Sequence, residues 1–79
     1  MKANREFELI VTRGSRAPAA LADPDRVDHI EIVEIASGEV VLFWDLMPSV
    51  TGRMSRALKG DLAQLEGEDF MARWSRYEP

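Results

Sequence analysis

The sequence contains no cysteine and only one histidine, His29. The chain can therefore form neither a disulfide nor a metal site built from thiolates, and by itself it cannot build a zinc site from histidines. Its longest apolar run, residues 40–44, is far shorter than the roughly 20 residues that a membrane-spanning helix needs. We expect a protein without disulfides and without a membrane span.

Catalytic motifs are also missing. None of the serines lies in a G-x-S-x-G sequence, and the chain has neither a Walker phosphate-binding loop nor a G-x-G-x-x-G turn. His29, Glu31 and Asp45 share one predicted strand face, and such residues could ligate a divalent metal. A flat, open sheet lacks the concave pocket that catalysis requires, so we interpret His29 either as the partner of Asp45 in a cross-strand ion pair or as a solvated side chain. We predict no enzyme, no cofactor and no metal.

The chain does contain enough apolar sequence for one folded domain. Of its 79 residues, 46% are hydrophobic and 30% are charged, and the formal net charge is -4. This length permits a single small, acidic domain over residues 1–79 and excludes a second independent core. The first six residues are polar and no apolar core of a signal peptide follows them, so we predict a cytoplasmic protein.

An alternating pattern marks the first predicted strand. Phe7, Leu9 and Val11 alternate with polar residues, which predicts a strand over 5–13. The segment 14–27 contains two prolines and several alanines and aspartates, and it predicts a long loop within the domain. The position of the first strand relative to the other strands stays open.

The clearest unit is a β-hairpin formed by residues 28–36 and 39–46. Both segments are rich in β-branched and aromatic residues. Ser37-Gly38 supplies the turn, and we expect a type I turn followed by a left-handed Gly38 in a G1 bulge, because glycine adopts a positive φ without Cβ strain. The resulting register pairs Val33 with Val41, Ile32 with Leu42, Ile30 with Trp44, and His29 with Asp45.

Two helices follow the hairpin. Apolar residues at spacings of three and four predict a helix over 50–66, with Ser49 as its N-cap and Gly67 as its C-cap. This apolar stripe comprises Val50, Met54, Ala57, Leu58, Leu62 and Leu65. Aromatic residues at helical spacing predict a second helix over 68–77. The fold class is therefore α+β: a three-stranded, mainly antiparallel sheet, built from a strand, a long loop and a β-hairpin, is followed by two helices packed on it.

The predicted sheet has two apolar faces, whereas an antiparallel sheet covered on one side should be polar on the other. The face that we expect the long helix to cover carries Phe7, Leu9, Val11, Ile30, Ile32, Val40, Leu42 and Trp44. The second face carries several carboxylates and His29, but also Ile10, Val33, Ile35, Val41 and Phe43. Three covers for these apolar residues stay open: the helix 68–77, a second copy of the chain, or a different partner.

Self-association is the function that this pattern favours. A helix as short as 68–77 is marginal by itself, whereas a second copy offers a larger cover and needs no new sequence. We predict a non-enzymatic protein-interaction module that forms a homodimer through the second sheet face. The predicted interface residues are Val33, Ile35, Val41, Phe43, Trp74 and Tyr77.

Two other functions stay open. Arg53, Arg56 and Lys59 repeat every third residue on the long helix, and such an array could contact the phosphates of a nucleic acid. The negative net charge opposes this function, so we expect no nucleic-acid partner. The second alternative is a small-molecule sensor with its pocket under the loop 14–27.

Overall fold

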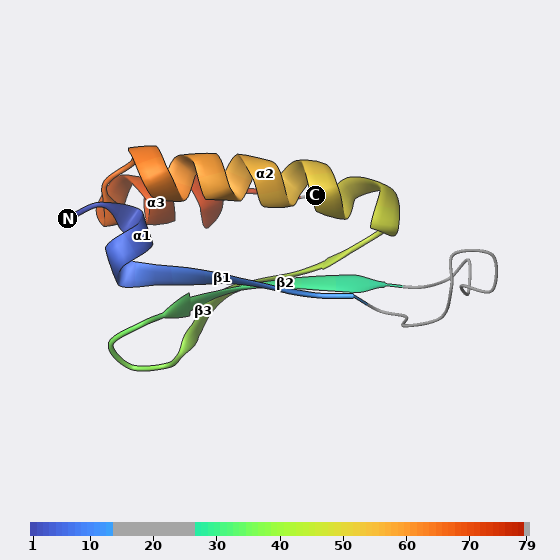
Figure 1. The fold of residues 1–79 in the computed structure, drawn as a ribbon, viewed down its shortest axis with the longest axis horizontal. Helices are drawn as coiled ribbons and strands as arrows, with labels where there is room; N and C mark the ends of the chain where they lie inside the picture. The colour runs from blue at the N-terminus through green and yellow to red at the C-terminus, as the bar shows by residue number, and fades with distance from the viewer. Residues whose placement is uncertain (14–26, 79) are drawn as a thin grey trace.

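The computed structural model describes residues 1–13 and 27–78, and the fold is α+β, as the sequence predicts. A three-stranded sheet is preceded by one short helix and followed by two longer ones (Figure 1). The elements are α1 (Ala3–Glu6), β1 (Phe7–Thr12), β2 (Asp28–Glu34), β3 (Val40–Leu46), α2 (Pro48–Gln64) and α3 (Gly67–Trp74). Nearly all of the predicted loop 14–27 lies outside the described residues.

The strands form one antiparallel sheet in the order β1-β2-β3. This order answers the question that the sequence leaves open, because the first strand pairs with β2 and β3 forms the opposite edge. β1 and β2 pair without a register shift from Phe7–Glu34 to Thr12–His29. Three of the four predicted hairpin pairs are confirmed: Ile32–Leu42, Ile30–Trp44 and His29–Asp45.

The fourth predicted pair is wrong, because β3 contains one extra residue next to it. Val33 pairs with Val40 and not with Val41. Val40, predicted to face the helices, is instead 49% exposed, whereas Val41 is half-buried and packs against the core. The conformation predicted for the turn glycine is confirmed, since Gly38 has a φ of 75°. The bulge thus exchanges the orientations expected for two neighbouring valines.

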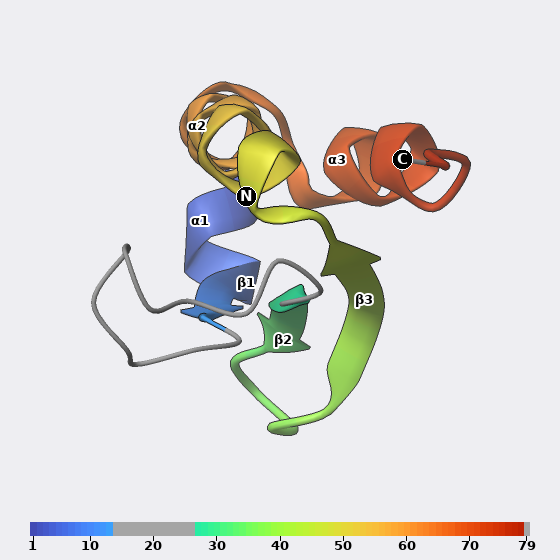
Figure 2. The same ribbon diagram turned by 90° about the vertical axis from the view of Figure 1, so that its right-hand side faces the viewer.

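All three helices lie on the same side of the sheet (Figures 1 and 2). The core fills the space between the helix layer and the sheet, and its buried members come from every element. They are Ala3, Phe7, Ile30, Ile32, Trp44, Leu46, Met54, Leu58, Leu62, Phe70 and Trp74. Within the part of the chain that the structure describes, no helix combines the length and the apolar character that crossing a membrane requires.

The start of α2 differs from the prediction. The helix begins at Pro48, with Met47 in the N-cap position, so Ser49 is not the N-cap. Proline suits the first helical position because its φ is preset and its missing N–H would have no intrahelical partner. The sheet holds this first turn: the Thr51 hydroxyl donates to the Asp28 carboxylate at 2.8 Å, and both residues are fully buried.

The bond from Thr51 to Asp28 turns the Thr51 side of α2 toward the sheet. Thr51 points toward the sheet, and Ser55, one turn later, is buried with it. Ala57, which the sequence assigns to the apolar stripe, is exposed, and Val50 is only half-buried. The buried stripe therefore runs through two small polar residues in addition to Met54, Leu58 and Leu62.

The helix ends where the following residues pair with the N-terminal segment. The Ala3 N–H donates to the Leu65 carbonyl at 2.9 Å, and the Gly67 N–H donates to the Met1 carbonyl at 3.1 Å. Gly67 therefore begins α3, and its predicted role as the C-cap of α2 is wrong. A Cβ at this position would overlap the end of the Glu6 side chain, so a larger residue here would make the Glu6 carboxylate move.

Because Thr51 bonds to Asp28 and Ser49 caps nothing, substitutions at these two positions of α2 should differ in their effect on stability. Thr51→Val keeps the shape of the side chain but takes a donor from a buried carboxylate, so we expect the free energy of unfolding to fall by about 1–3 kcal/mol. Ser49→Ala should change it by less than about 0.5 kcal/mol, because Ser49 is exposed and caps nothing. Chemical denaturation followed by circular dichroism measures both values. An equal loss at the two positions would contradict this account of the helix start.

Candidate functional site

The candidate functional site is the face of the sheet that is turned away from the helices. Because side chains alternate across a strand, the register determines which residues lie there. We call this surface the outer face. It consists of Glu8, Ile10, Thr12, His29, Glu31, Val33, Val40, Phe43 and Asp45. Figure 2 shows that α1, α2 and α3 all lie on the other side of the sheet.

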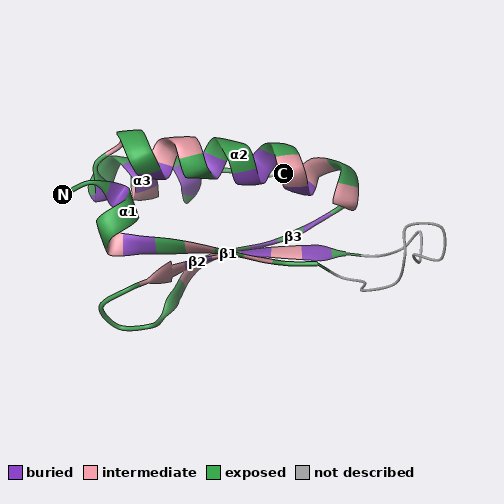
Figure 3. Cartoon of the chain, viewed as in Figure 1, coloured by how far each residue is buried: buried purple, intermediate pink, exposed green. Residues whose placement is uncertain are grey.

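Apolar side chains gather at the turn end of the outer face. Val40 and Phe43 are 49% and 52% exposed, and Val33 is half-buried as the cross-strand partner of Val40. Ile35, in the turn that follows β2, is 53% exposed. Ile10, at 38% exposed, extends this apolar patch onto β1. The exposed hairpin end projects away from the helices (Figure 3). A contiguous apolar patch of this kind is typical of a surface that another molecule covers.

Carboxylates accompany the apolar patch. Each strand contributes one to the outer face: Glu8 from β1, Glu31 from β2 and Asp45 from β3. The sequences of the three strands contain no lysine or arginine. Arg13, which follows β1, is bonded at 3.2 Å to Asp28 on the helix side of the sheet. The outer face is therefore acidic as well as apolar.

His29 forms the cross-strand pair that the sequence predicts. Its Nδ1 lies 2.6 Å from Oδ1 of Asp45, and its ring stacks on Phe43 with the centroids 5.5 Å apart. Since an ionised carboxylate can only accept hydrogen bonds, Nδ1 carries the hydrogen and donates it. Among residues 1–13 and 27–78, no three His, Asp or Glu side chains are placed to hold a metal ion.

The structure places two of the six predicted interface residues, Val33 and Phe43, on the outer face. Ile35 follows β2, is 53% exposed and lines a hollow beside α1. Val41 contacts the core, because the bulge gives its outward position to Val40. The sequence does not show where in β3 the extra residue lies, so it does not show which of Val40 and Val41 points outward.

The other two predicted interface residues, Trp74 and Tyr77, lie on the helix side. α3 ends at Trp74, whose side chain is 6% exposed and whose Nε1 donates to the Asp61 carboxylate at 2.9 Å. The ring meets Trp44 edge-on at 6.0 Å and Tyr77 at 5.0 Å. The segment 68–77 therefore completes the core, and the hypothesis that it covers the outer face is wrong.

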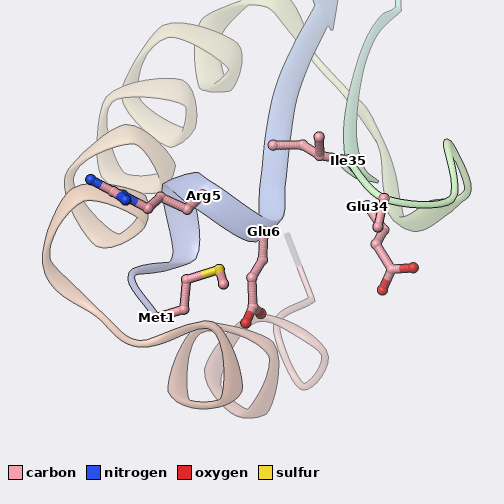
Figure 4. Close-up of a pocket in the computed structure, with 6 residues that line it drawn as sticks. Met1, Arg5, Glu6, Glu34 and Ile35 are labelled. Atoms are coloured by element: carbon pink, nitrogen blue, oxygen red, sulfur yellow. The ribbon is translucent and has the colours of Figure 1, made fainter.

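A hollow of about 460 Å³ lies beside α1 (Figure 4). Its lining consists of Met1, Arg5, Glu6, Glu34, Ile35 and Ala36. The charged ends of Arg5, Glu6 and Glu34 point in different directions, so they do not converge on one ligand (Figure 4).

The N-terminal amine forms an ion pair near this hollow. The Glu66 carboxylate lies 2.6 Å from the Met1 amine. This hydrogen bond and the charge of Glu66 raise the pKa of the amine, and the same bond lowers the pKa of Glu66.

The basic residues of α2 are exposed, as a nucleic-acid site would require. Arg53, Arg56 and Lys59 all reach solvent, and none of them forms an ion pair within the described part of the chain. The pocket of the sensor alternative is predicted under the loop 14–27, of which residues 14–26 lie outside the described ranges.

Sequence reasoning misses the buried position of Asp28. This carboxylate accepts hydrogen bonds from Thr51 and Arg13 at the start of β2. The neighbouring aspartates and proline suggest only a turn. The signal lies in the alternation, since Asp28 has the same parity as Ile30 and Ile32 and must face the helices with them.

The exposed cations of α2 give a direct test of the nucleic-acid alternative. We expect no measurable binding to duplex DNA at about 50 mM salt. The net charge of -4 repels the phosphates, and the three cations of α2 are too few to overcome this repulsion. Fluorescence anisotropy with a labelled duplex measures this binding. A complex that weakens steeply with added salt and disappears in the Arg53→Glu/Arg56→Glu variant would contradict the expectation.

No protein-family model matches the chain, and comparison with curated proteins and with solved structures finds no similar protein.

Proposed function

We propose that the chain is a non-enzymatic, cytoplasmic protein-interaction module whose outer face binds the outer face of a second copy, forming a homodimer. The observation that carries this proposal is the exposure of Val40 and Phe43 on a sheet whose helices all lie on the other side. Covering the exposed half of an apolar side chain of this size contributes about 1 kcal/mol. A few such side chains on each copy favour association by a few kcal/mol in total.

The outer face complements itself about a two-fold axis that runs along β2. Such an axis sets β1 of one copy against β3 of the other and leaves β2 facing β2. Ile10 then meets Phe43 of the second copy, because both residues share a row with Glu31. Thr12 meets Asp45 of the second copy, where its hydroxyl can donate to the carboxylate. The same axis sets Glu8 against Val40 and Glu31 against Glu31 of the second copy, so the carboxylates oppose a contact that the apolar pairs favour.

The dimensions of the outer face set the strength of such a contact. Strands of seven residues at a rise of about 3.4 Å, three abreast at about 4.8 Å, give a surface of about 14 by 24 Å. Two such faces amount to about 670 Å² in total, which is below the size of a standard specific interface. We expect a weak dimer with a dissociation constant of tens of micromolar or more.

Phe43→Glu tests the proposal directly. The parent chain should approach twice its mass of 8.9 kDa when light scattering is measured at several hundred micromolar. Phe43 is half-exposed and lies outside the core, so the variant should keep the circular dichroism spectrum and melting temperature of the parent. Its mass should fall to that of one chain, because a charge then enters the apolar contact.

Ala57→Glu is the matched control, since it adds the same charge at an exposed position of α2 on the helix side. This variant should remain dimeric. The proposal fails if the parent chain stays monomeric at several hundred micromolar, or if Ala57→Glu dissociates the dimer and Phe43→Glu does not.

A further inference from the structure

We infer that the free edge of β1 is a second binding surface, which takes an extended acidic segment of a partner protein as a fourth strand of the sheet. An edge strand binds a peptide in this way when its unused backbone groups pair with those of the added strand. The inference is independent of the proposed homodimer, because the edge binds through backbone groups and not through the side chains of the outer face.

The backbone of β1 carries hydrogen-bonding groups that the sheet does not use. The Ile35 N–H donates to the Glu6 carbonyl at 2.9 Å, so these two residues form a hydrogen-bonded pair of the antiparallel ladder. Such pairs alternate along the ladder, and the residues of β1 that bond to β2 are therefore the even-numbered ones. Leu9 and Val11 point their N–H and C=O groups away from β2, toward the free edge.

Nothing in the described part of the chain pairs with these four groups of Leu9 and Val11. The Phe7 N–H, which points the same way, donates to the Ala3 carbonyl where α1 ends. Many edge strands carry a proline, a lysine or a bulge that prevents further pairing. β1 has none of these, whereas β3 at the opposite edge contains the bulge. β1 is thus the edge that can accept another strand.

Two cations lie on the flank of α2 that faces the β1 edge. α3 packs on the other flank, where Trp74 donates to Asp61 of α2, and Figure 2 shows α3 on the β3 side and α2 above α1 and β1. A helix turns about 100° per residue, which places Arg56 and Lys59 on the flank away from Asp61. Arg56 extends along this flank, with Nη1 3.6 Å from the point that a Cβ of Gly52 would occupy. Both cations are exposed and form no ion pair with the described residues.

These features determine the chemistry of the segment that fits. Its main chain pairs with Leu9 and Val11, and its side chains on the helix side approach Arg56 and Lys59. Carboxylates at these positions form ion pairs, whereas on the outer face the segment lies beside Glu8, where apolar residues avoid repulsion. A second copy of β1 fits less well, because it would bring the cations of two α2 helices together. The favoured partner is an extended segment that alternates acidic with apolar residues.

Hydrogen exchange, measured by NMR on the ¹⁵N-labelled full chain, tests the edge. The probe is a synthetic peptide of about seven residues that alternates valine with glutamate. In the free chain the amides of Leu9 and Val11 should exchange fast and that of Ile10 slowly, because of the three only Ile10 bonds to β2. Saturating peptide should slow exchange at Leu9 and Val11 at least about tenfold. The Phe43→Glu variant should respond in the same way, because its substitution lies on β3.

Charge reversal tests the two cations. A peptide that alternates valine with lysine should bind at least about tenfold more weakly than the glutamate peptide, because two repulsions replace two ion pairs. The Arg56→Glu/Lys59→Glu variant should reverse this preference. The matched control, Arg53→Glu/Arg76→Glu, changes the charge equally at exposed positions on the solvent side of α2 and after α3, and it should keep the parent preference.

Each contrary result overturns the inference in a different way. Slow exchange of Leu9 and Val11 in the dilute chain would show that another segment of the chain occupies the edge. Protection that grows with chain concentration alone would show that a second copy does. Equal binding of the two peptides, or no slowing by either, would exclude the acidic partner. None of these results bears on the outer face, and a parent chain that stays monomeric would overturn the proposed homodimer without affecting the edge.

Discussion

The pairing of the N-terminal segment with residues 65–67 determines where α3 lies. Backbone hydrogen bonds join Ala3 and Leu65, and Gly67 lets the Glu6 side chain approach the start of the helix. Phe7 then stacks on Phe70 at 5.8 Å. These contacts hold α3 on the helix side with α2, and both helices bury their apolar surface against the same face of the sheet. The opposite face keeps its apolar side chains in solvent as a consequence.

The outer face combines one force that favours association with one that opposes it. Covering the exposed half of each apolar side chain contributes about 1 kcal/mol. Two carboxylates a few ångströms apart in a partly hydrated contact repel each other by an energy of similar order. Glu31 lies between Ile10 and Phe43 at the centre of this face, so its charge opposes an apolar contact that these two side chains favour.

Alternation within a strand is a local signal, and it predicts the sheet, the hairpin and three of its four pairs. The left-handed Gly38 is equally local, because only the turn itself demands it. The bulge that exchanges Val40 and Val41 leaves no local signal, since both residues are valine. The side of the sheet on which Asp28 lies follows from the same alternation, but its partner Thr51 is far along the chain, and the position of Trp74 depends on a distant contact with Trp44. The sequence therefore predicts an apolar outer face, but it does not show that Val41 and Trp74, two of the predicted interface residues, belong to the core.

The most direct test of the outer face as the contact is the dilution of ¹⁵N-labelled chain followed by NMR. Residues at a dimer contact change their amide chemical shifts as the concentration passes through the dissociation constant, from several hundred micromolar to about 5 µM. The account predicts that these changes concentrate at Val33, Val40 and Phe43 and spare the exposed side of α2. Spectra that do not change with dilution, or changes confined to the helices, would contradict it.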